Sequence, residues 1–154
     1  MSRATTTHRG FRLVGIDHAP FEPLFGLTDE QLRARHAVRC VATASHGYPC
    51  RVSLEDAHEG EELLLLPYAH HPVDSPYQAS GPIYVRRGAQ QRTLPPGEVP
   101  PNVTRRLISV RAYDAGHTMV AASVCGGETP APVAVRASCV GIAAARARAR
   151  CPRG

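Results

Sequence analysis

Cys50 and His70 are the side chains in this sequence best suited to nucleophilic chemistry. A cysteine reacts as its thiolate, which a neighbouring base or positive charge stabilises. Arg51 is adjacent, but consecutive side chains of a strand point to opposite faces, so it is poorly placed to activate Cys50. The alternative is a small buried cysteine, because unpaired cysteines are among the most buried residue types. We favour burial and keep Cys50, His70 and Asp74 as the candidate catalytic set.

The string HHPVD, residues 70–74, also contains groups that bind metal ions. His70, His71 and Asp74 could supply two or three ligands of hard or borderline type. Their spacing matches no familiar metal site, and adjacent histidines in a loop are usually solvated. We therefore expect neither a metal ion nor another cofactor.

The segment DSPYQASGPIYVR, residues 74–86, is the strongest candidate for a binding loop. Binding groups concentrate on loops that a sheet holds in place. A guanidinium holds a carboxylate or phosphate through its planar fork, and hydroxyls can orient the bound group. The candidate ligand-binding residues are Arg86, Arg111, Ser75, Tyr77 and Asp114. The alternative is structural, because Asp and Ser before Pro stabilise turns and Arg at a strand end is often solvated.

Short apolar runs between turn signals are the elements that would position these groups. One helix is predicted over residues 29–36, where Thr28 and Gln31 form a capping-box pattern. Because LLLL at 63–66 is continuous, its strand should be covered on both faces. The turn signal at Asp114–His117 predicts a β-hairpin. Besides this hairpin, strands are expected at 11–16, 38–42, 50–53, 63–68 and 82–86. The last of them is expected to be isolated between proline-rich loops.

The fold class that follows is α+β, with a mainly antiparallel sheet of about six short strands and one or two helices. The connections are too short for repeated βαβ crossovers. We expect a single domain over residues 8–127. Residues 128–154 form a tail rich in Arg, Ala and Pro, with little periodicity and no aromatic residue.

Composition and charge restrict the partners of the chain. Leu, Ile, Val and Phe make up about a fifth of the 154 residues, enough for a thin core. No apolar run approaches a membrane span, and the first residues contain no apolar stretch typical of a secretion signal, so we expect a cytoplasmic protein with reduced cysteines. Most of the net charge of +5 lies in the tail. Nucleic acid is not expected as a partner, because its binding needs a basic face on the folded domain.

Three motifs, PCRVSLEDA, DSPYQASGPIYVR and ISVRAYDAG, occur in that order. With them the chain resembles an uncharacterised family of small bacterial proteins, number twelve hundred and three among the domains of unknown function. The resemblance covers about residues 11–127 and implies a fold and a set of motif positions rather than a reaction. The matching positions are Cys50, Arg51, Ser53, Glu55, Asp56, Asp74, Ser75, Pro76, Tyr77, Gly81, Arg86, Arg111 and Asp114.

The C-terminal segment departs from that resemblance. Family members are expected to end with a helix, then a strand carrying a His-x-His-Asn element and a Gly-Cys pair, and nothing after Gly127 matches this pattern. The composition of the tail is that of GC-rich DNA translated in another frame. We interpret residues 128–154 as either frameshifted or disordered.

Two functions remain open at this point. In the first, the domain binds a small anionic molecule at the loop of residues 70–87. If the protein is an enzyme, it also transforms that molecule. In the second, it is a non-catalytic structural or interaction protein whose motif residues serve turns and packing. The sequence does not define the oligomeric state.

Overall fold

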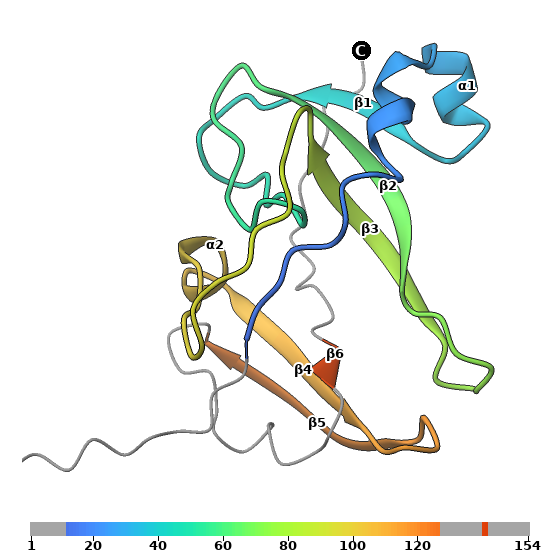
Figure 1. Ribbon diagram of the computed structural model, residues 1–154, viewed down its shortest axis with the longest axis vertical. Helices are drawn as coiled ribbons and strands as arrows, with labels where there is room; N and C mark the ends of the chain where they lie inside the picture. Colours follow the sequence, from blue (N-terminus) through green and yellow to red (C-terminus); the bar gives the residue numbers. More distant parts are fainter. Residues whose placement is uncertain (1–11, 127–139, 142–154) are drawn as a thin grey trace, which may run out of the picture.

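Two antiparallel sheets of three strands each form the framework in a computed structural model, which describes residues 12–126 and 140–141 (Figure 1). The strand orders are β1–β2–β3 and β5–β4–β6. The elements are η1 (Glu22–Gly26), α1 (Asp29–Arg33), β1 (Val38–Val41), β2 (Glu62–His71), β3 (Ala79–Arg86), α2 (Pro101–Thr104), β4 (Leu107–Tyr113), β5 (Met119–Gly126) and β6 (Val140–Gly141). The α+β class with mainly antiparallel strands is therefore confirmed.

Strand β2 is the centre of the first sheet, and both of its faces are covered. Leu64 and Leu66 pack into a cluster with Phe21, Phe25 and other residues. Leu63 lies in a second cluster together with Cys40, Ala42, Ala57 and Tyr84. Successive side chains of a strand alternate between faces, so two buried faces require a continuous apolar run. The prediction made from LLLL is confirmed.

Helix α1 begins with the predicted capping box. The Thr28 hydroxyl accepts a hydrogen bond from the Gln31 N–H at 3.3 Å, and the Gln31 side chain accepts one from the Thr28 N–H at 2.9 Å. The helix ends at Arg33 rather than at residue 36, and His36 has a φ of 57° in the turn that follows. No helix in the described residues is long and apolar enough to cross a membrane.

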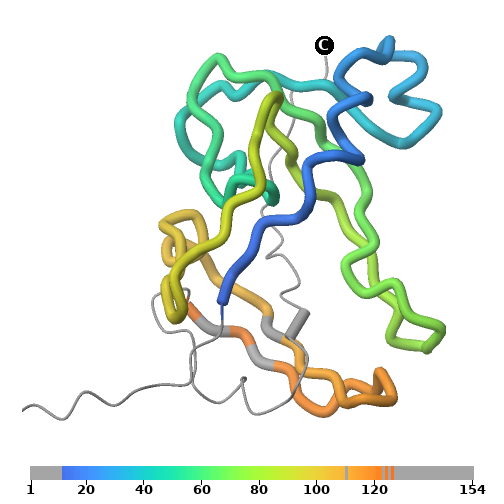
Figure 2. The backbone as a smooth tube through the Cα atoms, viewed as in Figure 1, coloured from blue at the N-terminus to red at the C-terminus, as the bar shows by residue number. Residues whose placement is uncertain are grey.

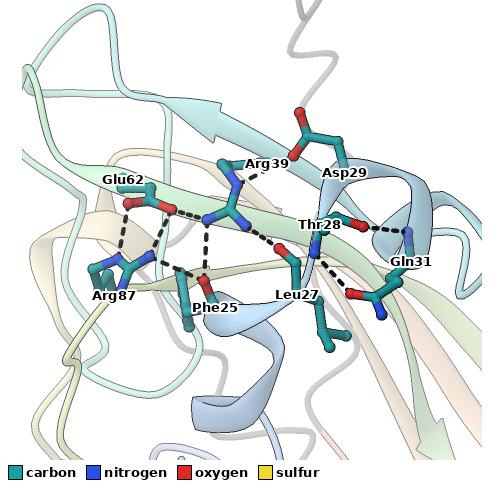
Figure 3. Close-up of polar contacts among 8 residues, drawn as sticks. All are labelled: Phe25, Leu27, Thr28, Asp29, Gln31, Arg39, Glu62 and Arg87. Atoms are coloured by element: carbon teal, nitrogen blue, oxygen red, sulfur yellow. Dashed lines mark hydrogen bonds and ion pairs between the residues drawn. The ribbon is translucent and has the colours of Figure 1, made fainter.

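A shared carboxylate ties the η1–α1 segment to the first sheet (Figure 3). Glu62 accepts hydrogen bonds from Arg39 of β1 and from Arg87, which follows β3. Arg39 also donates to the carbonyls of Phe25 and Leu27, at 3.3 and 2.7 Å, and Arg87 donates to that of Phe25 at 3.1 Å. Both arginines thereby satisfy carbonyl groups at the end of η1 that the short helix leaves without partners.

Two predicted strands are wrong. Of residues 12–16, Val14 alone forms a bridge, to Thr93, and the N-terminal segment runs beside residues 87–100 as a connection (Figure 2). Residues 50–53 form a tight turn, in which the Cys50 N–H donates to the Glu55 carbonyl at 2.9 Å. Leu54 occupies the left-handed region there, with a φ of 57°. The turn depends on a backbone conformation that Leu rarely adopts, so the residue type at this position gives no turn signal.

The two hairpins agree more closely with the predicted strands. β3 pairs with β2 along most of its length, from Arg86 opposite Leu63 to Ala79 opposite His71, so residues 82–86 are not isolated. The hairpin predicted around Asp114–His117 is confirmed as β4 and β5. In the tail, β6 pairs with β4 at Arg111 and Ala112. The remainder of residues 128–154, and with it the predicted frameshift or disorder, lies outside the described residues.

Candidate functional site at the hairpin tips

The ends of the β2–β3 and β4–β5 hairpins meet through aromatic rings. The His71 ring stacks on Tyr113, with centroids 4.0 Å apart and planes inclined by 20°. His117 lies edge-on to His71 at 5.9 Å, and Tyr77 lies edge-on to Tyr113 at 6.4 Å. In Figure 1 the two tips project to the same side of the molecule. We call the group formed by His70, His71, Tyr77, Arg111, Tyr113 and His117 the hairpin site.

The β4–β5 turn is fixed by Asp114. One of its carboxylate oxygens accepts hydrogen bonds from the N–H groups of Gly116 and Thr118, each at 2.9 Å. His117 adopts a left-handed φ of 62° within this turn. The Asp114 carboxylate is thus engaged by backbone N–H groups of its own turn, which is the structural alternative to ligand binding. The turn that it stabilises places His117 against His71.

The β2–β3 loop is held by Ser75. Its hydroxyl accepts a hydrogen bond from the Tyr77 N–H at 3.2 Å and donates one to the His117 carbonyl at 3.4 Å. Asp74 is exposed on the same loop, and its carboxylate makes no hydrogen bond or ion pair within the described chain. Ser75 therefore connects the two tips, while Asp74 faces solvent.

The hairpin site contains a guanidinium that has no ion-pair partner among the described residues. The Arg111 guanidinium is half-buried and makes no hydrogen bond or ion pair with any described residue. Burial lowers the pKa of His70, the charges of Arg111 and His71 lower it further, and the backbone of Tyr68 acts in the opposite sense. The Nε2 atom of His71 is buried and has no hydrogen-bond partner among the residues at 12–126 and 140–141. Two polar groups of this site thus lack the partners that buried polar groups usually have.

Cys50 is not part of the hairpin site. Its side chain is 0% exposed, and its sulfur accepts a hydrogen bond from the Arg86 N–H at 3.4 Å. Cys50 lies opposite Tyr84, which pairs with Leu65. His70 follows Leu65 by five residues, about 16 Å along a strand. The structure therefore does not bring Cys50 and His70 together, and Cys50 has the buried position that its alternative interpretation predicts.

Arg86 also lies away from the hairpin site, near the opposite end of β3. Its guanidinium pairs with Glu61 at 3.2 Å and lies 3.9 Å from Glu55. Burial raises the pKa of Glu61, but the His58 N–H and the Arg86 charge outweigh it, so the net shift is downward. These carboxylates neutralise Arg86. Of the two arginines predicted to bind a ligand, Arg111 is therefore the one available to an anion.

The HHPVD residues His70, His71 and Asp74 are the metal-ligand candidates of the sequence. In the part of the chain that the structure describes, no group of three or more His, Cys, Asp or Glu side chains is arranged to hold a metal ion. His71 packs against a tyrosine ring instead.

Sequence reasoning placed five of the candidate residues at these tips: His70, Asp74, Ser75, Tyr77 and Asp114. It missed Tyr113 and His117, which flank and occupy the turn of the predicted hairpin. The turn signal itself was the available clue, because it places both side chains at the end of the hairpin. No local sequence pattern predicts that one hairpin tip packs on the other.

Comparison with known proteins adds a family but no reaction. A family model described as "Protein of unknown function (DUF1203)" matches residues 47–144. The match includes every residue of the hairpin site, begins after α1, and extends beyond Gly127, where we expected the resemblance to end. No curated protein and no solved structure matches the chain.

Proposed function

Since the chain belongs to the DUF1203 family, whose description assigns no function, we propose from geometry alone that it binds a small anionic molecule at the hairpin site. One observation carries the proposal: Arg111 is half-buried near His70 and forms no ion pair within the described chain. Charged side chains that leave water are usually paired. An anionic ligand would supply the missing partner.

The surrounding groups fit a carboxylate or phosphate. Arg111 offers a planar fork of N–H donors that matches two oxygens of either group. Tyr77, which is 37% exposed and lies edge-on to Tyr113, carries a hydroxyl that is a further donor. His71 Nε2 would donate in its protonated form or in the tautomer that carries the proton there. Ser75 and Asp114 hold the two tips and act as positioning residues.

The alternative role, turns and packing, accounts for several motif residues. Asp114 and Ser75 make local hydrogen bonds, and Cys50 is buried in the sheet. A purely structural role does not account for Arg111, because a half-buried cation that has no ion-pair partner among the described residues costs stability. The proposal concerns binding, since the buried thiol offers no nucleophile to this site.

A titration with inorganic phosphate and with citrate tests the proposal. The imidazole proton signals of His70 and His71, assigned with His→Gln variants, report on the site. We expect saturable shifts in the wild-type chain and at least about tenfold weaker binding in Arg111→Gln, the effect of losing a charge-assisted hydrogen-bond pair.

The matched control is Arg33→Gln, which removes the same charge from an exposed position in α1. It should bind like the wild type. Absence of saturation with both anions, or equal weakening in the two variants, would show that the site does not bind anions.

The pH dependence of binding has a defined sign. A bound anion favours protonated His70, so it raises the pKa that burial and Arg111 hold down. Affinity should therefore increase as the pH falls through the pKa of His70 in the complex. His70→Gln should remove that increase while retaining binding through Arg111.

A further inference from the structure

A second cluster of charge lies where the turn of residues 50–56 meets α2. Within the turn, the Leu54 N–H donates to the Cys50 carbonyl at 3.1 Å, and Leu54 has a left-handed φ. Arg106, just after α2, forms an ion pair with Asp56 at 3.2 Å, and these side chains are 20% and 13% exposed. The ion pair fixes the two segments against each other.

The cluster contains more positive than negative charge. The Arg51 guanidinium makes no hydrogen bond or ion pair with any residue that the structure describes. Burial lowers the pKa of Arg51, and the nearby charge of Arg106 lowers it further, while Cys50 and Asp56 act in the opposite sense. Asp56 is already bound by Arg106, so it offsets one of the two cations.

Two further polar side chains in these segments are buried and have no hydrogen-bond partner among the residues that the structure describes. They are the Ser53 hydroxyl, in a residue 5% exposed, and the Asn102 amide oxygen, in a residue 4% exposed. Ser53 lies between Arg51 and Asp56 in sequence. Asn102 belongs to α2 and Arg106 follows it by four residues, where the Arg106 N–H donates to the Val103 carbonyl at 3.1 Å, so both residues belong to one short segment.

This cluster is separate from the hairpin site. Arg106 immediately precedes β4, and Arg111 lies five residues further on, about 16 Å along the strand. In Figure 1, α2 lies at the start of β4, at the opposite end from the β4–β5 turn. A ligand at one place does not reach the other if it is a single phosphate or carboxylate group.

We propose that Arg51, Ser53, Asn102 and Arg106 form a second binding site for an oxyanion, the phosphoryl or carboxylate group of a small solute. The oxyanion completes the charge balance of two arginines and one aspartate. The Ser53 hydroxyl donates to it. The Asn102 amide, whose two ends are interchanged by a half-turn about its last side-chain bond, presents its N–H₂ group. The inference goes beyond the proposed function and does not depend on it.

The test follows the side-chain Nε–H signals of Arg51 and Arg106 by NMR at constant ionic strength. Phosphate is added in one titration, acetate in a second and chloride in a third. We expect saturable shifts with phosphate or acetate, and whichever of the two binds more tightly identifies the preferred group. Chloride, which cannot fill a guanidinium fork with two oxygens, should give weak, unsaturated shifts.

Two variants locate the binding. Arg51→Gln should weaken it at least about tenfold, judged from the Arg106 signal. Ser53→Ala removes one hydroxyl, is the milder change for folding, and should weaken binding about threefold to tenfold. Arg111→Gln is the matched control, because it removes a cation from the hairpin site and should leave these shifts unchanged.

The outcomes separate the two proposals. Loss in Arg51→Gln with retention in Arg111→Gln supports the second site, whatever happens at the first. No saturable shift with either oxyanion, or equal affinity in the wild type, Arg51→Gln and Ser53→Ala, overturns it. If Arg111→Gln abolishes these shifts, a single site at the hairpin tips explains them and the second site does not exist.

Discussion

Replacing Glu62 by Gln should destabilise the junction between η1 and the first sheet. The Glu62 carboxylate lies between Arg39 and Arg87 (Figure 3), and the three side chains are 26%, 27% and 52% exposed. The half-buried bond to Arg39 is charge-assisted and contributes about 1 kcal/mol after solvent screening, and the more exposed Arg87 pair about 0.5 kcal/mol. An amide keeps one acceptor oxygen but directs its N–H₂ group toward a guanidinium. We expect a loss of about 1.5 kcal/mol, or a fall in Tm of about 3–6 °C for a chain of this length.

The pH dependence of this loss distinguishes charge from packing. Hydrogen bonds from Arg87 and Arg39 lower the pKa of Glu62, although burial opposes the shift. On acidification the unfolded chain therefore takes up the proton first, and the stabilisation is present above the ordinary value of 4.5 and is lost as the pH falls through the lowered pKa. Thermal unfolding followed by circular dichroism at pH 7 and at decreasing pH should show the wild-type advantage shrinking below that value.

The control is Glu98→Gln, because Glu98 is exposed and its carboxylate makes no hydrogen bond or ion pair in the described part of the chain. It should leave Tm nearly unchanged at pH 7. The reasoning is refuted if the two variants lower Tm equally, or if the Glu62→Gln deficit is the same at every pH.

Three more outcomes are expected from the described contacts. Leu64→Ala, at a fully buried position in β2, should cost about 3 kcal/mol in urea unfolding, and a loss below about 1 kcal/mol would contradict the packing of this face. Because burial and Arg111 lower the pKa of His70, the wild type should lose stability as the pH falls below the ordinary value of 6.5, whereas His70→Gln should not; parallel stability curves would rule this out. Leu54→Gly relieves a left-handed leucine, so Tm should stay constant or rise by a few degrees, while Leu54→Val should lower it; the reverse order would mean that the turn does not require a left-handed residue.

The parts of the fold that were predictable are those encoded by short-range chemistry. Thr28 and Gln31 specify a helix start within four residues, and the four leucines specify a strand buried on both faces. The segment around Asp114–His117 specifies a turn, because Asp114 accepts hydrogen bonds from its own backbone. Each of these features depends on neighbours in the sequence, so the pattern and its cause lie in the same window.

The errors come from tertiary contacts and from one unusual backbone conformation. Residues 50–53 were predicted as a strand because they follow the turn signal at His46-Gly47, but Leu54 turns the chain where a glycine would normally be the signal. The hairpin site was found in part because its loops were found. The stacking of His71 on Tyr113, which brings the loops together, joins residues 42 positions apart and leaves no local trace.

The motif residues fall into two groups, according to whether their charged groups have partners within the described chain. Glu55 pairs with Arg92, Asp56 with Arg106 and Arg86 with Glu61, and Asp114 caps its own turn. These contacts explain such residues through folding alone. Arg51 and Arg111 differ, because each is half-buried and neither forms an ion pair within the described chain. Leaving a cation in that state lowers stability, so a neutral replacement should raise stability, whereas an arginine kept only for folding should lose stability when it is replaced. The argument for ligand binding rests on these two arginines: if Arg51→Gln and Arg111→Gln are each more stable than the wild type without anion, and each loses the stabilisation that anion gives the wild type, both arginines serve binding at the expense of stability.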